Sequence, residues 1–358
     1  MEFNGNMVKV ARESRRLTQT ELSEKLDISQ VLVSKIEADL YPLTEKLVSN
    51  IAEKLSYPIS FFENNVLSID MGTKLHRKRL ALTKKDENYI DSLVSIYTLC
   101  ISKLLNFVDI EINIPEIPID ENNSIPDIAC ELRNVWNIPK GTLPNLIGYM
   151  EKNGIFVFDI DMPIAHFDAV STYNNALNIG IIVINKNQPA DRYRFTLAHE
   201  LGHLIMHRNS FSSEKENEAN NFASAFLMPE KDIYDQLQNI NFWNLTDYKQ
   251  IWKVSMAALI RRAYDLSIID KRKYTSLNVR LSQEGYKKCE PLCGLVKEKP
   301  SLFKDLLTYF STNLNYSEKD ILSVLSLFRE DYIEYFDLQY SNNFSPKVIK
   351  LSDYKRGS

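Results

Sequence analysis

Apolar residues near the N-terminus recur every three or four positions, which is the spacing of amphipathic helices. The pattern falls into four short segments, "MVKVARESRR", "TQTELSEKL", "SQVLVSKIE" and "LTEKLVSNIAEKL". Thr18 and Glu21 form a capping-box pattern before the second segment, and Ser29 and Thr44 stand where N-cap hydroxyls would begin the next two. The sequence therefore predicts a small all-α domain over residues 1–63.

A connecting region follows this domain. The stretch "KLHRKRLALTKK", residues 74–85, is the most basic in the chain and precedes the amphipathic pattern "ENYIDSLVSIYTLCISKLLNFV". Prolines and acidic residues in "EINIPEIPIDENNSIP" exclude a helix and predict an extended linker. We expect residues 64–127 to be a helical connector and linker between two globular units.

The apolar pattern over residues 128–275 has both helical and strand periods. Helical segments, "IACELRNVWNI" and "LPNLIGYMEKNG", precede the β-rich runs "IFVFDID", "HFDAVSTYN" and "NIGIIVIN", and further helical segments follow. Helices on either side of a group of strands are typical of the α+β class. The run "IIVIN" could be an edge strand that pairs with an extended peptide substrate. Residues 276–358, rich in Phe and Tyr at helical spacing, predict a C-terminal helical region of unknown role.

Composition limits the cellular setting. The 358-residue chain fits two or three domains, and its four cysteines are too sparse for a disulfide framework. Cys289 and Cys293 lie close together but lack a second pair that would complete a tetrahedral zinc site. No apolar run is long enough to cross a bilayer, so we expect a cytoplasmic protein with no membrane partner. The net charge of −4 indicates that any DNA contact is local.

Three of the five histidines fall in one apolar helical segment, "RFTLAHELGHLIMH". His199 and His203 are four residues apart, so a helix places both on one face, with Glu200 beside them. This H-E-x-x-H pattern suits a zinc hydrolase, which needs two neutral imidazoles, an open coordination position for water and a carboxylate to accept the water's proton. The alternative is a core helix with hydrogen-bonded histidines. The surrounding apolar residues favour zinc, because buried imidazoles need a partner.

The third zinc ligand is expected in the next helical segment, "EKENEANNFASAF". Glu216 and Asn220 share one face of that helix, whereas Glu214 and Glu218 share a face that turns away. We select Glu216 as the ligand and Asn220 as the residue that orients a ligating histidine, since such outer hydrogen bonds fix the ring. Glu218 is the second choice, and acids in a first helical turn can also serve the helix dipole alone.

Three other residues near these motifs have less support. His207 lies about 12 Å along the helix axis from His199, too far to share its ion. We place it beside a ligand or at the surface. Ser171 and Tyr173 lie on a predicted strand and could approach the metal, although ordinary sheet positions are the simpler interpretation.

These motifs, together with the flanking "FDAVSTYNNALNIGIIVIN" and "KVSMAALIRRAYDL", resemble the ImmA/IrrE family of zinc metallopeptidases over roughly residues 128–275. The resemblance implies a zincin-like domain in which His199, His203 and Glu216 bind zinc and Glu200 is catalytic. It also implies cleavage of a regulatory protein, commonly a helix-turn-helix repressor, which releases genes of stress response or mobile elements.

The first 60 residues resemble the XRE-type helix-turn-helix of phage repressors, in which the third helix enters the major groove. The resemblance implies DNA contacts from Gln30, Val31, Leu32, Ser34 and Lys35, with Gln19 meeting a phosphate or flanking Gln30. "E-A-D" replaces the usual "E-R-G" after the third helix, so an arginine is missing. DNA binding through residues 7–55 is one hypothesis, and a docking module that could form a homodimer is another.

Three functions fit these observations. The first is a zinc-dependent endopeptidase that cleaves a repressor-type protein. The second is a DNA-binding transcriptional regulator whose metal domain senses without cleaving. The third combines both activities in a toxin–antitoxin or phage-defence component. The presence of Glu200 favours the peptidase, because a site that only binds a ligand does not need this carboxylate.

Overall fold

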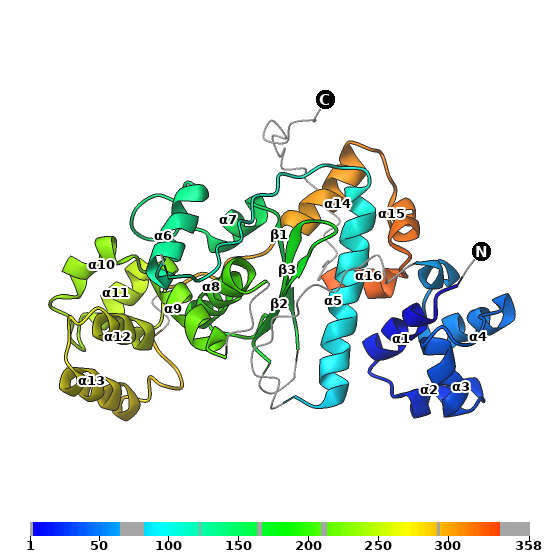
Figure 1. The fold of residues 1–358 in the computed structure, drawn as a ribbon, viewed down its shortest axis with the longest axis horizontal. Helices are drawn as coiled ribbons and strands as arrows, with labels where there is room; N and C mark the ends of the chain where they lie inside the picture. Colours follow the sequence, from blue (N-terminus) through cyan, green and yellow to red (C-terminus); the bar gives the residue numbers. More distant parts are fainter. Residues whose placement is uncertain are drawn as a thin grey trace.

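The computed structural model describes residues 3–64, 82–121, 123–162, 167–208, 213–291 and 294–336. Most of the basic stretch at 74–85, as well as Cys293, lies outside these ranges. Figure 1 shows helices at both ends of the molecule and a small sheet between them, so the predicted α+β class is confirmed. No helix within the described ranges is both long and apolar enough to cross a membrane.

The N-terminal domain forms the helices that its capping residues predict. Its elements are α1 (Gly5–Ser14), α2 (Gln19–Leu26), α3 (Gln30–Glu37), α4 (Glu45–Leu55) and the 3-10 helix η1 (Ile59–Glu63). The side chains of Thr18, Ser29 and Thr44 each accept a backbone hydrogen bond at the start of a helix, and Glu21 completes the capping box. Inside the domain Arg12 pairs with Glu37 at 2.5 Å.

A long helix and an extended segment connect this domain to the rest. Helix α5 (Lys84–Leu105) packs against α1 on one side and against strand β3 of the sheet on another. The predicted linker is extended, but it packs on the second domain, where Ile117 donates its backbone N–H to the carbonyl of Ile205 at 2.9 Å. Its isoleucines at 114 and 117 are buried. The linker is therefore part of that domain's surface.

The sheet contains β1 (Ile155–Ile160), β2 (Ala169–Asn174) and β3 (Ile179–Asn185) in the order β1-β3-β2. Strand β3 is parallel to β1 and antiparallel to β2, so it lies at the centre. The prediction that "IIVIN" forms an edge strand is therefore wrong. Its unbroken apolar character reflects burial on both faces of the sheet, and because the two outer strands are buried as well, this character could not reveal which strand is central.

The second domain contains eight described helices in addition to the sheet. These are α6 (Ile125–Val135), α7 (Leu146–Lys152), α8 (Ala190–Met206) and α9 (Lys215–Leu227), followed by α10 (Glu230–Leu237), α11 (Leu245–Trp252), α12 (Met256–Asp265) and α13 (Lys271–Gln283). Helix α8 carries the histidines and packs against both the sheet and α9. Helices α10 to α13 form a cluster at the end of the molecule farthest from the helix-turn-helix (Figure 1).

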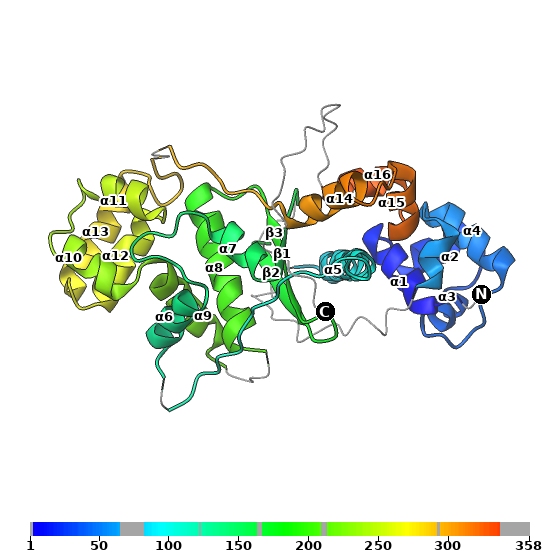
Figure 2. The same cartoon turned by 90° about the horizontal axis from the view of Figure 1, so that it is seen from above.

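The C-terminal helices contact the N-terminal domain. Helices α14 (Leu302–Thr312), α15 (Glu318–Leu325) and α16 (Arg329–Phe336) lie between the sheet and α4 in Figure 2. Arg15, the C-cap residue of α1, pairs with Asp331 at 2.6 Å, and the Tyr57 and Tyr335 hydroxyls are 2.7 Å apart. The C-terminal region thus joins the helix-turn-helix to the body of the protein.

Helices α8 and α9 approach closely at Gly202. A Cβ added there would lie 2.9 Å from Cδ1 and 3.2 Å from Cγ of the Phe222 ring. We expect Gly202→Ala to push α9 away, because overpacking costs about 1–3 kcal/mol while alanine regains at most about 1 kcal/mol of helix propensity. The variant should unfold at a lower temperature than the wild type, both measured with chelator present. An unchanged or higher melting temperature would show that the helices do not need this close approach.

Candidate metal centre

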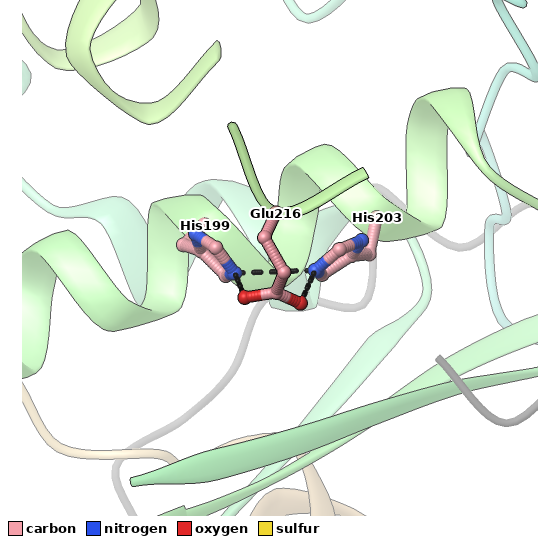
Figure 3. A group of neighbouring side chains, drawn as sticks. All are labelled: His199, His203 and Glu216. Carbon is pink, nitrogen blue, oxygen red and sulfur yellow. Dashed lines mark hydrogen bonds and ion pairs between the residues drawn. The ribbon is translucent and has the colours of Figure 1, made fainter. Parts of the chain in front are cut away.

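Three predicted metal ligands converge between α8 and α9 (Figure 3). The Nε2 atoms of His199 and His203 are 3.1 Å apart, and the Glu216 carboxylate oxygens lie 3.6 and 3.5 Å from them. Both imidazoles are buried, whereas the Glu216 side chain is 35% exposed. The group is therefore open to solvent on the glutamate side.

The three side chains lie close enough together to bind one metal ion. Zinc bonds of about 2.0–2.1 Å at tetrahedral angles place neighbouring donor atoms about 3.3 Å apart. The two histidine nitrogens are 3.1 Å apart, and each lies 3.5–3.6 Å from a different oxygen of Glu216. When one atom is taken from each residue, the three donors lie within 4.8 Å of one another. Two imidazoles and one carboxylate also form a donor set that leaves a fourth position for water or substrate, as in catalytic zinc sites.

A hydrogen bond orients the His199 ring. Its Nδ1 atom lies 3.0 Å from the side-chain oxygen of Asn220, one turn beyond Glu216 on α9. Because that oxygen only accepts, His199 carries its proton on Nδ1, and the Nε2 lone pair faces the metal position. The structure thus places Asn220 where the sequence predicted an orienting residue.

A chain of hydrogen bonds orients the His203 ring through His207 and Glu218. The His203 and His207 Nδ1 atoms are 2.9 Å apart, and His207 Nε2 lies 2.8 Å from Glu218. Burial and then the neighbouring His203 lower the pKa of His207 to about 4, so this ring is neutral at pH 7. A neutral His207 donates to the Glu218 carboxylate from Nε2 and accepts from His203 at Nδ1, which leaves His203 Nε2 free to bind a metal.

This chain corrects the expectation that Glu218 faces away from the histidines. Glu218 was the second choice for the third ligand, but Glu216 is the glutamate that lies beside His199 and His203. His207 is the C-cap residue of α8 and reaches past the end of that helix, where it meets the flank of α9. Helical periodicity within α9 alone could not reveal this contact, because it depends on how the two helices pack.

The carboxylate of Glu200 is fully buried beside the histidines and is oriented by the sheet. The Ser171 hydroxyl on β2 donates to Glu200 Oε2 at 2.6 Å. Tyr173, two residues further on the same strand, instead contacts the guanidinium of Arg208, which lies 3.6 Å from its ring centre. Ser171 is a polar residue on the face of β2 that packs against α8, and this feature of the sequence could have indicated its contact with Glu200.

The predicted DNA-contact residues lie together on the N-terminal domain. Gln30, Val31, Ser34 and Lys35 are exposed on α3, whereas Leu32 is half-buried against the core. Gln30 donates to the side chain of Gln19 at 2.7 Å, so Gln19 flanks Gln30. The two glutamines extend the polar surface from α3 to the start of α2.

Family comparisons match two parts of the chain. Residues 150–264 match the IrrE N-terminal-like domain of peptidase family M78, and residues 8–62 match a helix-turn-helix family. The predicted architecture, an ImmA/IrrE-type domain with an N-terminal XRE-type helix-turn-helix, is confirmed. No curated protein matches the chain significantly.

The matched segment contains the whole candidate metal centre. It is a metallopeptidase-like domain of a typically metal-dependent family, and the His199, His203 and Glu216 group lies within it. The helix-turn-helix domain supports DNA binding.

The hydrogen-bond chain predicts that His207 contributes to metal affinity. His207→Ala removes the acceptor for His203 Nδ1–H, so we expect zinc to bind about 10–100-fold more weakly. Competition with a chromophoric chelator measures the affinity. Glu214→Gln, an exposed change on the N-terminal side of α9, is the matched control and should bind zinc like the wild type. Equal affinities for all three proteins would contradict the assignment.

Proposed function

We propose that this protein is a zinc-dependent endopeptidase that cleaves a regulatory, repressor-type protein. The observation that carries the proposal is the position of Glu200, a buried carboxylate held at 2.6 Å by Ser171 beside two histidines and a glutamate. A site that only stores or senses metal does not require an additional oriented carboxylate. Hydrolysis does, because water must lose a proton as it attacks.

The residues divide into those that bind the metal and those that move protons. His199, His203 and Glu216 would hold zinc, which when bound lowers the pKa of water to about 7 and polarises a carbonyl group. Glu200 accepts the proton of the attacking water and returns it to the leaving amine. Ser171 fixes the orientation of the Glu200 carboxylate.

The proposed substrate class comes from the family resemblance. A helix-turn-helix repressor is the substrate type that the ImmA/IrrE family implies, and cleavage would release genes of stress response, mobile elements or defence. The protein's own helix-turn-helix domain supports an action near DNA. A transcription factor bound at a neighbouring site is therefore the kind of substrate that we propose.

A second candidate is a DNA-binding regulator whose metal domain senses without cleaving. The observation that favours it is the attachment of the helix-turn-helix to the body of the protein through Arg15, Tyr57 and α16, which links a DNA-binding element to the metal domain. A mobility-shift assay with the protein's own upstream DNA addresses this candidate. Specific binding without proteolysis would favour the regulator over the peptidase.

The peptidase proposal predicts a selective effect of Glu200→Gln. We expect this variant to keep its zinc, because Glu200 lies outside the ligand group, and to cleave about 10²–10⁴-fold more slowly. The assay incubates zinc-loaded protein with the repressor-type regulator encoded beside its gene and follows the fragments by mass spectrometry. Ser171→Ala should lose less activity, since it removes only an orienting bond. Cleavage by Glu200→Gln at the wild-type rate would refute the proposal.

A further inference from the structure

A cleft separates the helix-turn-helix domain from the first turns of α5. From the DNA-facing side it is lined by Gln19, Gln30 and Ser34, and from α5 by Lys84, Lys85 and Asn88. The residues expected to face DNA therefore share a surface with a helix that lies outside the helix-turn-helix domain.

The cleft lining is rich in basic side chains, although the whole chain has a net charge of −4. The lining includes five basic residues, Lys9, Arg12, Arg16, Lys84 and Lys85, and two acidic residues, Glu13 and Glu37. Both glutamates are buried and bind Arg12. Three carboxylates outside the lining, Asp86, Glu87 and Glu21, pair with Arg16, Lys84 and Lys85. The basic side chains that remain near solvent thus favour an anionic partner.

The two helices that read DNA cannot supply this charge themselves. Helix α2 contains two glutamates and one lysine, and α3 contains one of each, so together they carry a net charge of −1. The segment after α3 begins Ala38-Asp39, without the arginine usual for the family. Because neutralisation of phosphates by Lys and Arg dominates DNA affinity, a domain with this deficit needs cations from elsewhere.

Several contacts fix the start of α5 beside α2. Arg16 lies 3.6 Å from Asp86 and its guanidinium is 4.4 Å from the ring centre of Tyr89. Lys85 lies 3.3 Å from Glu21 in the first turn of α2. Figure 1 shows this end of α5 on the same side of the molecule as α2 and α3. The two lysines are thus held at the flank of the DNA-facing surface.

The lysines remain available to a polyanion. The Lys84 side chain is 78% exposed, and that of Lys85 is 45% exposed. Their carboxylate neighbours are Glu87 at 3.0 Å, which is 19% exposed, and Glu21 at 3.3 Å, which is 44% exposed, so neither pair is buried. Such surface pairs contribute little stability, so exchanging the carboxylate for a phosphate costs little.

We propose that Lys84 and Lys85 bind phosphates of duplex DNA next to the site that α2 and α3 read. The DNA surface then spans two parts of the chain, with sequence read by the helix-turn-helix and backbone held by α5. This inference rests on the DNA-binding part of the proposed function and is independent of peptidase activity. It also makes α5, which packs against the sheet, a direct contact between DNA and the body of the protein.

The test compares Lys84→Gln/Lys85→Gln with a matched double variant, Lys54→Gln/Lys319→Gln. The control residues are exposed lysines on α4 and α15 that do not line the cleft, so both variants lose the same charge. Glutamine keeps the helix propensity of lysine. Fluorescence anisotropy measures the binding of full-length protein to a labelled duplex of about 30 bp from its own upstream DNA, and to a scrambled duplex, between about 50 and 200 mM salt.

We expect the α5 variant to bind both duplexes more weakly than the wild type. Its plot of log affinity against log salt should also be less steep, by about 0.9 for each lysine that contacts a phosphate. The control should match the wild type, and all three proteins should have the same melting temperature. Equal slopes for the two variants, or tighter binding by the α5 variant, would overturn the proposal. If the wild type binds neither duplex, the DNA-binding function fails and this proposal fails with it.

Discussion

Three electron-rich side chains, His199, His203 and Glu216, meet in a largely buried site that could hold a metal ion. The hydrogen bonds of Asn220 and His207 place protons on the outer nitrogens of both imidazoles, so their inner lone pairs face each other across 3.1 Å. The Glu216 carboxylate adds a negative charge at the same point. Without an ion, these groups would repel one another, and burial would strengthen that repulsion.

Packing between α8, α9 and the sheet brings these groups together. Glu216 reaches the histidines only because α9 packs closely against α8, which Gly202 permits. Glu200 is oriented by the sheet through Ser171, whose neighbour Val170 points into the core shared with α5. One strand therefore contributes alternate residues to the metal side and to the helix-turn-helix side of the molecule. Tyr97 of α5 stacks on Phe158 of β1 at 4.0 Å and reinforces the second contact.

Local patterns predicted much of the fold and the site. Capping residues marked the helices of the first domain, and the four-residue spacing of His199 and His203 placed both on one face of α8. The same spacing in α9 selected Glu216 with Asn220. Patterns within one element could not predict what depends on packing between elements: the contact of Glu218 with His207, the central position of β3, and the docking of α16 on α1.

X-ray absorption spectroscopy of the zinc-loaded protein tests the central claim most directly. The geometry predicts one zinc ion per chain, bound by two imidazole nitrogens and a carboxylate oxygen at about 2.0–2.2 Å. Glu216→Ala should remove the carboxylate contribution and reduce zinc content. Sulfur coordination, or a protein that binds no zinc, would contradict the assignment of His199, His203 and Glu216 as the metal centre.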